Sequence, residues 1–167
     1  MENSSIRSLV IKHAEKDLGL TESPNGSNKV KYNDWYFEEG SYYFKNSKKY
    51  AWCGTFVAYV YFHSGVFLSD DIHVSIVYIP AFQNLVRKLD LITVNPREGD
   101  AVVYDFNNDN TEDHIGIFYK WEEFGKTFWS IEGNTSPDEK GSQSNGGMVC
   151  KKLRHIDDVE GFYDLIG

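Results

Sequence analysis

The hydrophobic pattern of this chain changes its period once, and this change limits the folds that the chain can adopt. Near the N-terminus, apolar residues such as Ile6, Val10 and Ala14 recur at helical spacing. After the turn-forming run 95–100, short segments alternate apolar and polar residues, as strands do. Helices followed by strands with short connections indicate an α+β fold, in which N-terminal helices pack on a C-terminal antiparallel β-sheet.

Three helices and four strands are predicted from this pattern. The first helix covers 4–18, the second covers 52–63 with Gly65 placed to end it, and the third starts at Pro80. The segment 21–33 is rich in turn-forming residues and is predicted to be a loop. The predicted strands are 101–106, 114–120, 126–132 and 148–152.

Composition restricts the class of protein further. The chain has 167 residues, of which 41% are hydrophobic and 25% charged, as expected for one globular domain over 1–167. Its net charge of −8 argues against nucleic acid as a main partner, and the short basic clusters at 48–49 and 151–154 are expected on solvated faces. No apolar run approaches the length of a membrane span, and the N-terminus lacks a signal-peptide layout. We expect a monomer that binds neither membrane nor nucleic acid.

The two strands on either side of the link WEEFG are predicted to form a hairpin. A hairpin symmetric about Glu123 sets His114 directly opposite Glu132, with Cβ atoms about 5 Å apart on one face. Asn134 shares this face if the second strand continues. The same register pairs Gly116 with Ser130 and Phe118 with Phe128. The opposite face is apolar and suited to the core: Ile115, Ile117, Tyr119, Trp129 and Ile131.

Cys53 is predicted at the start of the second helix, where a thiol has three alternative roles. The alternatives are a buried structural thiol, half of a disulfide with Cys150, and a nucleophile. A thiol reacts as its thiolate, and its pKa falls at a helix N-terminus beside an imidazolium. His114 can accept the thiol proton while Glu132 or Asn134 orients its ring. These residue types therefore favour a cysteine nucleophile.

Two neighbours of Cys53 are predicted to contact substrate. Gly54 has no side chain and lets a substrate approach the backbone of the helix start. Trp52 adjoins the nucleophile and is expected to line the cleft, with a place in the core as the alternative. The backbone N–H of Cys53 is a natural donor to an oxyanion.

Five sequence blocks follow one another along the chain: WCGTFVAYVYFHSG, PREGDAVVYDF, DHIGIF, IEGNTS and SNGGMV. Their order resembles that of the CHAP family, the cysteine, histidine-dependent amidohydrolases and peptidases. The likeness is greatest to the catalytic modules of phage cell-wall lysins. An upstream segment, SPNGSNKVKYNDWY, extends the resemblance over nearly the whole chain.

The resemblance implies a papain-like fold and cleavage of amide bonds in peptidoglycan. It assigns the nucleophile to Cys53 and the base to His114, and it assigns the acidic and amide members of the site to Glu132 and Asn134. No cofactor is implied. Many cell-wall lysins carry a separate wall-binding domain, and we expect none within residues 1–167. Without a signal peptide, we expect the protein to be made in the cytoplasm and released to the wall by a holin or a secretion machine.

Several alternatives stay open at this point. The bond that is cut is either the N-acetylmuramoyl-L-alanine amide or a peptide bond of the stem or cross-bridge. A phage endolysin is favoured, with an interbacterial toxin amidase and a non-catalytic wall-binding module as alternatives. The stretch DFNNDNTEDH places Asp105, Asn107 and Asp109 like the start of a calcium-binding EF-hand loop, but lacks its glycine and its final glutamate. A polar hairpin loop is favoured there, and no metal site is expected.

Overall fold

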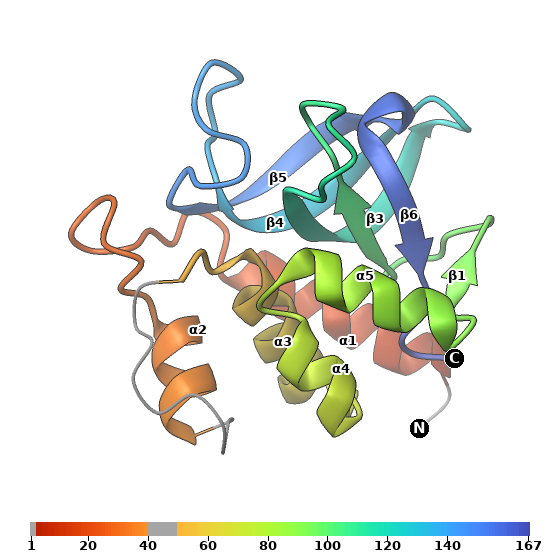
Figure 1. Ribbon diagram of the computed structural model, residues 1–167, viewed down its shortest axis with the longest axis horizontal. Helices are drawn as coiled ribbons and strands as arrows, with labels where there is room; N and C mark the ends of the chain where they lie inside the picture. The colour runs from red at the N-terminus through yellow and green to blue at the C-terminus, as the bar shows by residue number, and fades with distance from the viewer. Residues whose placement is uncertain (1–2, 40–49) are drawn as a thin grey trace.

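The fold is α+β, as the change of hydrophobic period predicts. The computed structural model describes residues 3–39 and 50–167. Figure 1 shows the helices gathered on one side of the molecule and the antiparallel sheet on the other. The described helices are α1 (Asn3–Lys16), α2 (Lys31–Asp34) continued by a π-helix (Trp35–Glu39), α3 (Cys53–His63), α4 (Asp70–Ser75) and α5 (Ile79–Lys88), and a 3-10 turn covers Ile156–Asp158.

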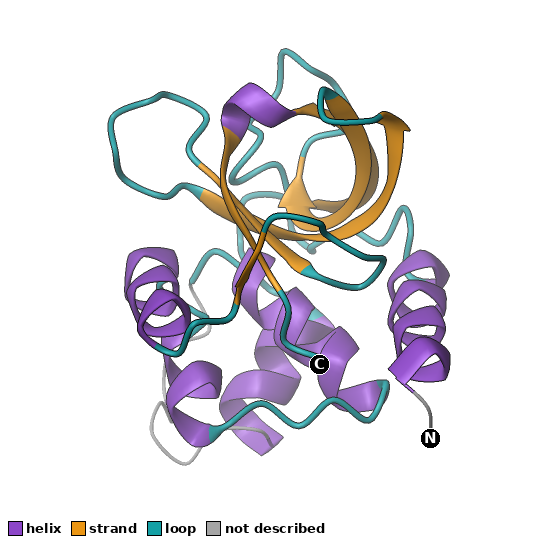
Figure 2. Ribbon diagram, turned by 90° about the vertical axis from the view of Figure 1, so that its right-hand side faces the viewer, coloured by secondary structure: helices purple, strands orange, loops and turns teal. Residues whose placement is uncertain are grey.

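The described sheet has six strands in the order β1-β6-β2-β3-β4-β5, and every neighbouring pair is antiparallel. Figure 2 shows that the sheet curls strongly above the helices. One face packs on the helices, and the other encloses a smaller aromatic cluster that includes Phe118, Phe128 and Phe162. The strands are β1 (Ile92–Thr93), β2 (Ala101–Tyr104), β3 (His114–Glu123), β4 (Thr127–Thr135), β5 (Met148–His155) and β6 (Val159–Tyr163).

The helix predictions need three corrections. The helix α1 ends at Lys16, two residues early, because Gly19 has a positive φ and Leu18 lies 41% exposed beyond the helix. The predicted loop 21–33 ends sooner than expected, since α2 begins at Lys31. The short helix α4 was not predicted, although the Ser69 side chain caps its N-terminus. Short helices depend on packing more than on periodicity, which explains this omission.

All four predicted strands exist, but with different ends. The strand β2 stops at Tyr104, and β3, β4 and β5 each continue three residues past the predicted end. Two strands, β1 and β6, were not predicted. Both are short, and β6 lies in the sheet between β1 and β2, far from its sequence neighbours. Such long-range pairing leaves no local signal in the sequence.

The predicted register of the β3–β4 hairpin is wrong by two residues. Ile117 pairs with Ile131 and Phe118 with Ser130, instead of Phe118 with Phe128. The register shifts further along the hairpin, where bulges add residues to β3. A shift of two residues keeps each side chain on its own face. Ile115, Ile117 and Ile131 therefore still reach the main core as predicted.

The basic cluster predicted on a solvated face is partly buried. Lys152 and Arg154 on β5 are 7% and 6% exposed, because both point to the face enclosed by the curled sheet. Lys48 and Lys49 lie outside the described residues. In the part of the chain that the structure describes, no helix is long and apolar enough to cross a membrane.

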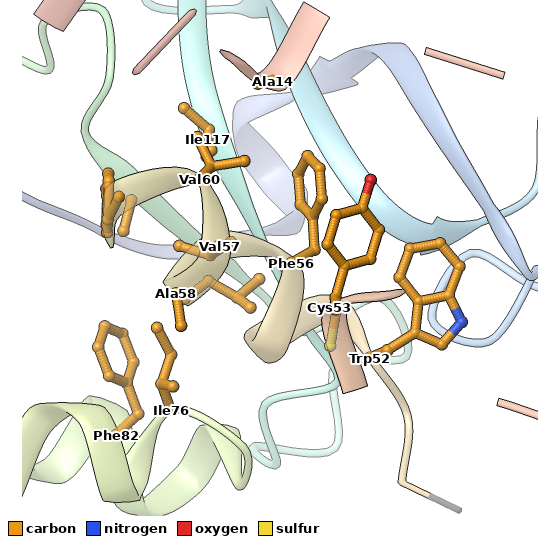
Figure 3. Packing of buried hydrophobic residues seen from close by; sticks show 14 of the residues in the cluster. Ala14, Trp52, Cys53, Phe56, Val57, Ala58, Val60, Ile76, Phe82 and Ile117 are labelled. Atoms are coloured by element: carbon orange, nitrogen blue, oxygen red, sulfur yellow. The ribbon is translucent and has the colours of Figure 1, made fainter. Parts of the chain in front are cut away.

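The helix α3 ends as predicted and forms the centre of the helical layer. Its C-terminus has the hydrogen bonds of a Schellman motif, from Gly65 N–H to Phe62 and from Val66 N–H to Tyr61, with Gly65 at φ +84°. The helix contacts both β3 and β4. Figure 3 shows Phe56, Val57 and Val60 among the buried side chains around it. The core thus fixes the position of the helix N-terminus relative to the sheet.

Gly54 is the tightest point of this packing. A Cβ on Gly54 would lie 1.9 Å from the Ile76 carbonyl oxygen, which is backbone and cannot move aside cheaply. We expect Gly54→Ala to lower the free energy of unfolding by about 3 kcal/mol, the upper end of overpacking costs. Denaturant unfolding followed by circular dichroism measures the change.

The matched control is Gly65→Ala at the other end of the same helix. Its Cβ would meet open space, so only the positive φ is unfavourable, at about 1 kcal/mol. Equal losses for the two variants would contradict the close approach at Gly54.

Candidate active site

Three of the predicted site residues come together where α3 meets the sheet. Cys53 is the first residue of α3, His114 is the first residue of β3, and Glu132 lies on β4. Cys53 is 4% exposed, and His114 and Glu132 are fully buried. The helix brings the thiol to the sheet because α3 packs on both of these strands.

The His114 ring is held through one nitrogen. Its Nε2 lies 3.1 Å from the Oε2 atom of Glu132. Its Nδ1 is buried and has no partner of ordinary hydrogen-bond geometry among residues 3–39 and 50–167. The Cys53 thiol nevertheless interacts with this ring and shifts its pKa. A loose contact of this kind is common before substrate binds, and it leaves Nδ1 as the nitrogen for the thiol proton.

Gly116 gives Glu132 its route to the histidine. Extending the β3–β4 register by one pair beyond Ile117 and Ile131 sets Gly116 opposite Glu132. A Cβ on Gly116 would lie 2.7 Å from the Glu132 Cγ atom. The Glu132 side chain therefore crosses β3 over Gly116 to reach His114. The sequence predicted the contact between His114 and Glu132, but placed it directly across the hairpin instead of on this diagonal.

Other side chains complete the surroundings of the Glu132 carboxylate. Arg154 on β5 donates from Nη2 to Oε2 at 2.6 Å and from Nε to Oε1 at 2.8 Å. The Ser130 hydroxyl donates to Oε1. A buried carboxylate with this many donors stays ionised. Sequence reasoning missed Arg154, because the pairing of β4 with β5 that brings it here is not evident from local pattern.

Opposite charges shift the pKa values of the site in a consistent direction. Burial raises the pKa of Cys53, but hydrogen bonding and charge interactions with His114 outweigh it, and the pKa ends below the ordinary 9.0. Burial lowers the pKa of His114, while Cys53 and Glu132 raise it from 6.5 to about 9. Burial also disfavours the Glu132 carboxylate, yet Arg154 and His114 hold its pKa far below 4.5. These shifts favour a thiolate beside an imidazolium near neutral pH.

Backbone groups of β3 and of the start of α3 add to this effect. Hydrogen bonding to the backbone of Ile115 and Gly54 also lowers the pKa of Cys53. Trp52 is the N-cap residue, and its side chain makes no capping hydrogen bond. The first amide groups of the helix are thus left for the thiolate and for a reacting oxygen.

The two residues predicted to contact substrate have structural roles instead. Trp52 is fully buried, stacks on Tyr32 with ring centroids 5.4 Å apart, and donates from its indole nitrogen to Glu22 at 3.1 Å. Figure 3 shows it beside the start of α3, among other buried side chains. Gly54 admits the protein's own backbone at Ile76, not a substrate. Trp52 and Gly54 thus help to fix the position of Cys53 through packing.

Asn134 lies at the far end of β4, where the strand no longer alternates regularly. Its φ is +61°, and the register shifts between Glu132 and Thr135. Its amide donates to Asn145 at 3.1 Å and accepts from the Gly147 N–H at 3.2 Å. These bonds fold the loop between β4 and β5. No hydrogen bond in the described part of the chain joins Asn134 to His114, so a direct role beside the histidine stays a prediction.

The remaining candidates are not members of the Cys53–His114–Glu132 group, although Cys150 is paired with Glu132 across β4 and β5. Cys53 and Cys150 are both buried free thiols, so the disulfide alternative is wrong. Asp113, which precedes His114 in the sequence, accepts a hydrogen bond from the Phe106 N–H. In the loop DFNNDNTEDH, the Asp105 carboxylate accepts hydrogen bonds from backbone N–H groups of the same loop. Among the described residues, no group of three or more His, Cys, Asp or Glu side chains could hold a metal.

Comparison with protein-family models found no match, and comparison with curated protein sequences found none either. The chemistry therefore has to be inferred from the site itself. A thiol of lowered pKa, a histidine that holds a proton and a carboxylate that orients it are the parts of a nucleophilic acyl transfer. The backbone N–H groups at the start of α3 are suitable donors to an oxyanion.

Removing the imidazole should return Cys53 to the behaviour of a buried thiol. In a Cys150→Ser background, we expect His114→Ala to raise the pKa of Cys53 above 9.0, because burial then acts without a neighbouring imidazolium. Ultraviolet absorbance of the thiolate during a pH titration measures this, with Cys53→Ala as the baseline. An unchanged titration midpoint would show that His114 does not activate the thiol.

Proposed function

We propose that this protein is a cysteine-dependent hydrolase of papain-like architecture that cleaves an amide bond in peptidoglycan. The observation that carries the proposal is the meeting of Cys53, at a helix N-terminus, with the buried His114–Glu132 pair. A papain-like architecture is supported by Cys53 at the start of a helix and His114 on an antiparallel sheet that packs against this helix.

The residues support a two-step cycle. The Cys53 thiolate attacks the carbonyl carbon of the amide and forms a tetrahedral intermediate, whose oxyanion accepts a hydrogen bond from the Cys53 backbone N–H. The His114 imidazolium then gives its proton to the leaving amine as the carbon–nitrogen bond breaks, which leaves a thioester. His114 next removes a proton from water, and the resulting hydroxide attacks the thioester carbon. The carbon–sulfur bond then breaks, which releases a carboxylic acid and restores the Cys53 thiolate beside the His114 imidazolium. Glu132 keeps the ring oriented throughout.

The substrate class rests on the resemblance to CHAP catalytic modules. The five sequence blocks of that resemblance contain Cys53, His114 and Glu132, the three residues that the structure brings together. We propose that the protein acts on the bacterial cell wall as a monomer, most simply as a phage endolysin released by a holin. The amide bond that is cut is either the N-acetylmuramoyl-L-alanine bond or a peptide bond of the stem or cross-bridge.

Removing either reacting group should abolish hydrolysis. We expect Cys53→Ala and His114→Ala to lose lysis of isolated sacculi by at least about a thousandfold, the usual loss for a nucleophile or its base. Turbidity measures the rate. Cys150→Ser is the matched control, since it removes the second buried thiol and leaves Cys53, His114 and Glu132 in place, and it should keep the lytic activity.

The chemical ends of the released fragments identify the bond. An L-alanine amino group freed from muramic acid indicates the amidase, and other free amines indicate an endopeptidase, both by mass spectrometry. Lysis by Cys53→Ala at the wild-type rate would refute the hydrolase and favour a wall-binding module. Lysis only after delivery into a competitor cell would favour the toxin alternative.

The rate should depend on pH as an ion pair requires. Activity needs the Cys53 thiolate and the His114 imidazolium together, so it rises as Cys53 loses its proton below pH 9.0 and falls as His114 loses its proton near pH 9. We expect a bell-shaped profile of kcat/KM on a soluble muropeptide. A rate that keeps rising through pH 9 would instead indicate an ordinary free thiol.

A further inference from the structure

Arg154 grips both oxygens of the Glu132 carboxylate. The bonds are 2.6 Å from Nη2 to Oε2 and 2.8 Å from Nε to Oε1, which is bidentate geometry. Arg154 pairs with Phe128 across β4 and β5, and therefore lies on the same face of the sheet as Glu132. The Oε2 atom that it binds is the one that contacts His114 Nε2.

The guanidinium of Arg154 is also held by contacts with groups other than Glu132. Its Nη1 donates to Gln143 Oε1 at 2.9 Å, and its Nη2 also donates to Thr135 Oγ1 at 3.3 Å. It lies 4.7 Å from the centroid of the Phe106 ring, as in a cation–π contact. With 6% of the residue exposed, the guanidinium has little freedom to leave Glu132.

The charges of the site alternate and sum to zero. In the reactive state they are the Cys53 thiolate, the His114 imidazolium, the Glu132 carboxylate and the Arg154 guanidinium. A buried group of charges is stable only if it is close to neutral. Without Arg154 the group would carry one net negative charge. The negative charge of Glu132 would then offset the positive charge of the His114 imidazolium, and the Cys53 thiolate would lose the positive charge that stabilises it.

We propose that Arg154 is a positioning residue of the hydrolase. Through its two hydrogen bonds to Glu132, Arg154 holds the carboxylate against His114 and balances the negative charge of this carboxylate. The His114 imidazolium can then stabilise the Cys53 thiolate. This inference rests on the proposed function, but its effect on the thiol can be measured without any substrate.

The other ionisable groups around Glu132 and Arg154 do not supply the positive charge that Arg154 places beside the carboxylate. Burial raises the pKa of the Tyr104 hydroxyl well above 10 and also raises that of the Cys150 thiol, so both stay neutral at pH 7. Lys152 donates to the Ser136 carbonyl at 2.9 Å, away from the carboxylate. Asp158 interacts with Arg154, and burial raises its pKa above 3.8.

The test titrates the thiolate absorbance of Cys53 in the Cys150→Ser protein. We expect Arg154→Met to raise the midpoint by about one pH unit, as loss of a nearby charge does. Arg154→Lys keeps the charge and should stay close to the parent. Lysis of sacculi should fall about tenfold or more in Arg154→Met and recover in part in Arg154→Lys.

Two further variants separate a charge effect from damage to the fold. Arg7→Met is the matched control, because Arg7 is a buried arginine paired with Asp100 at 2.7 Å, and its loss should leave the midpoint of Cys53 unchanged. Glu132→Gln retains Arg154 as a cation without its carboxylate partner, within the same buried group of charges as the thiolate. Its midpoint should therefore lie below that of Glu132→Gln/Arg154→Met.

The outcomes decide between the two proposals. An unchanged midpoint in folded Arg154→Met overturns the positioning role. If that variant does not fold, equal midpoints for Glu132→Gln and Glu132→Gln/Arg154→Met overturn it. If the parent protein fails to lyse sacculi while the midpoints shift as expected, the hydrolase proposal fails and the control of the thiol by Arg154 stands.

Discussion

The buried Glu132 carboxylate is the constraint on which the rest of the site depends. A carboxylate without exposure is unfavourable unless it is paired, and here it is bound by His114 on β3, Ser130 on β4 and Arg154 on β5. One side chain thus ties three neighbouring strands together. Removing one partner of a buried ion pair costs about 3–5 kcal/mol, so the same contacts that orient the histidine also stabilise the sheet.

Two glycines let the backbone come close enough for this arrangement. Gly54 admits the Ile76 carbonyl against the first turn of α3, and Gly116 admits the Glu132 side chain across β3. The close approach at Gly54 fixes the position of the Cys53 thiol, and the close approach at Gly116 lets the Glu132 carboxylate reach the imidazole of His114. Since catalytic groups must be held to a fraction of an ångström, both glycines contribute to geometry although neither touches the reacting atoms.

Much of the fold and of the site could be predicted from local sequence pattern. The errors concern features that depend on contacts between distant segments. The three predicted helices, the four predicted strands and the contact of His114 with Glu132 all follow from periodicity and from a short hairpin link. The register was wrong because the hairpin turns around Gly125 instead of Glu123, and the bulges in β3 make up only part of this difference. Trp52 and Gly54 were assigned to substrate because adjacency to Cys53 does not reveal whether the neighbouring surface is open or covered.

Hydrophobic period and turn chemistry are local properties, so the fold class and the residue types of the site can be predicted from the amino-acid sequence. Which residues balance the charge of Glu132 depends on contacts that form only in the folded protein. Arg154 looked like part of a solvated basic cluster, yet the pairing of β4 with β5 turns it inward onto the carboxylate. A charge becomes part of a buried site through contacts between distant segments, and its own neighbours in the sequence do not record those contacts.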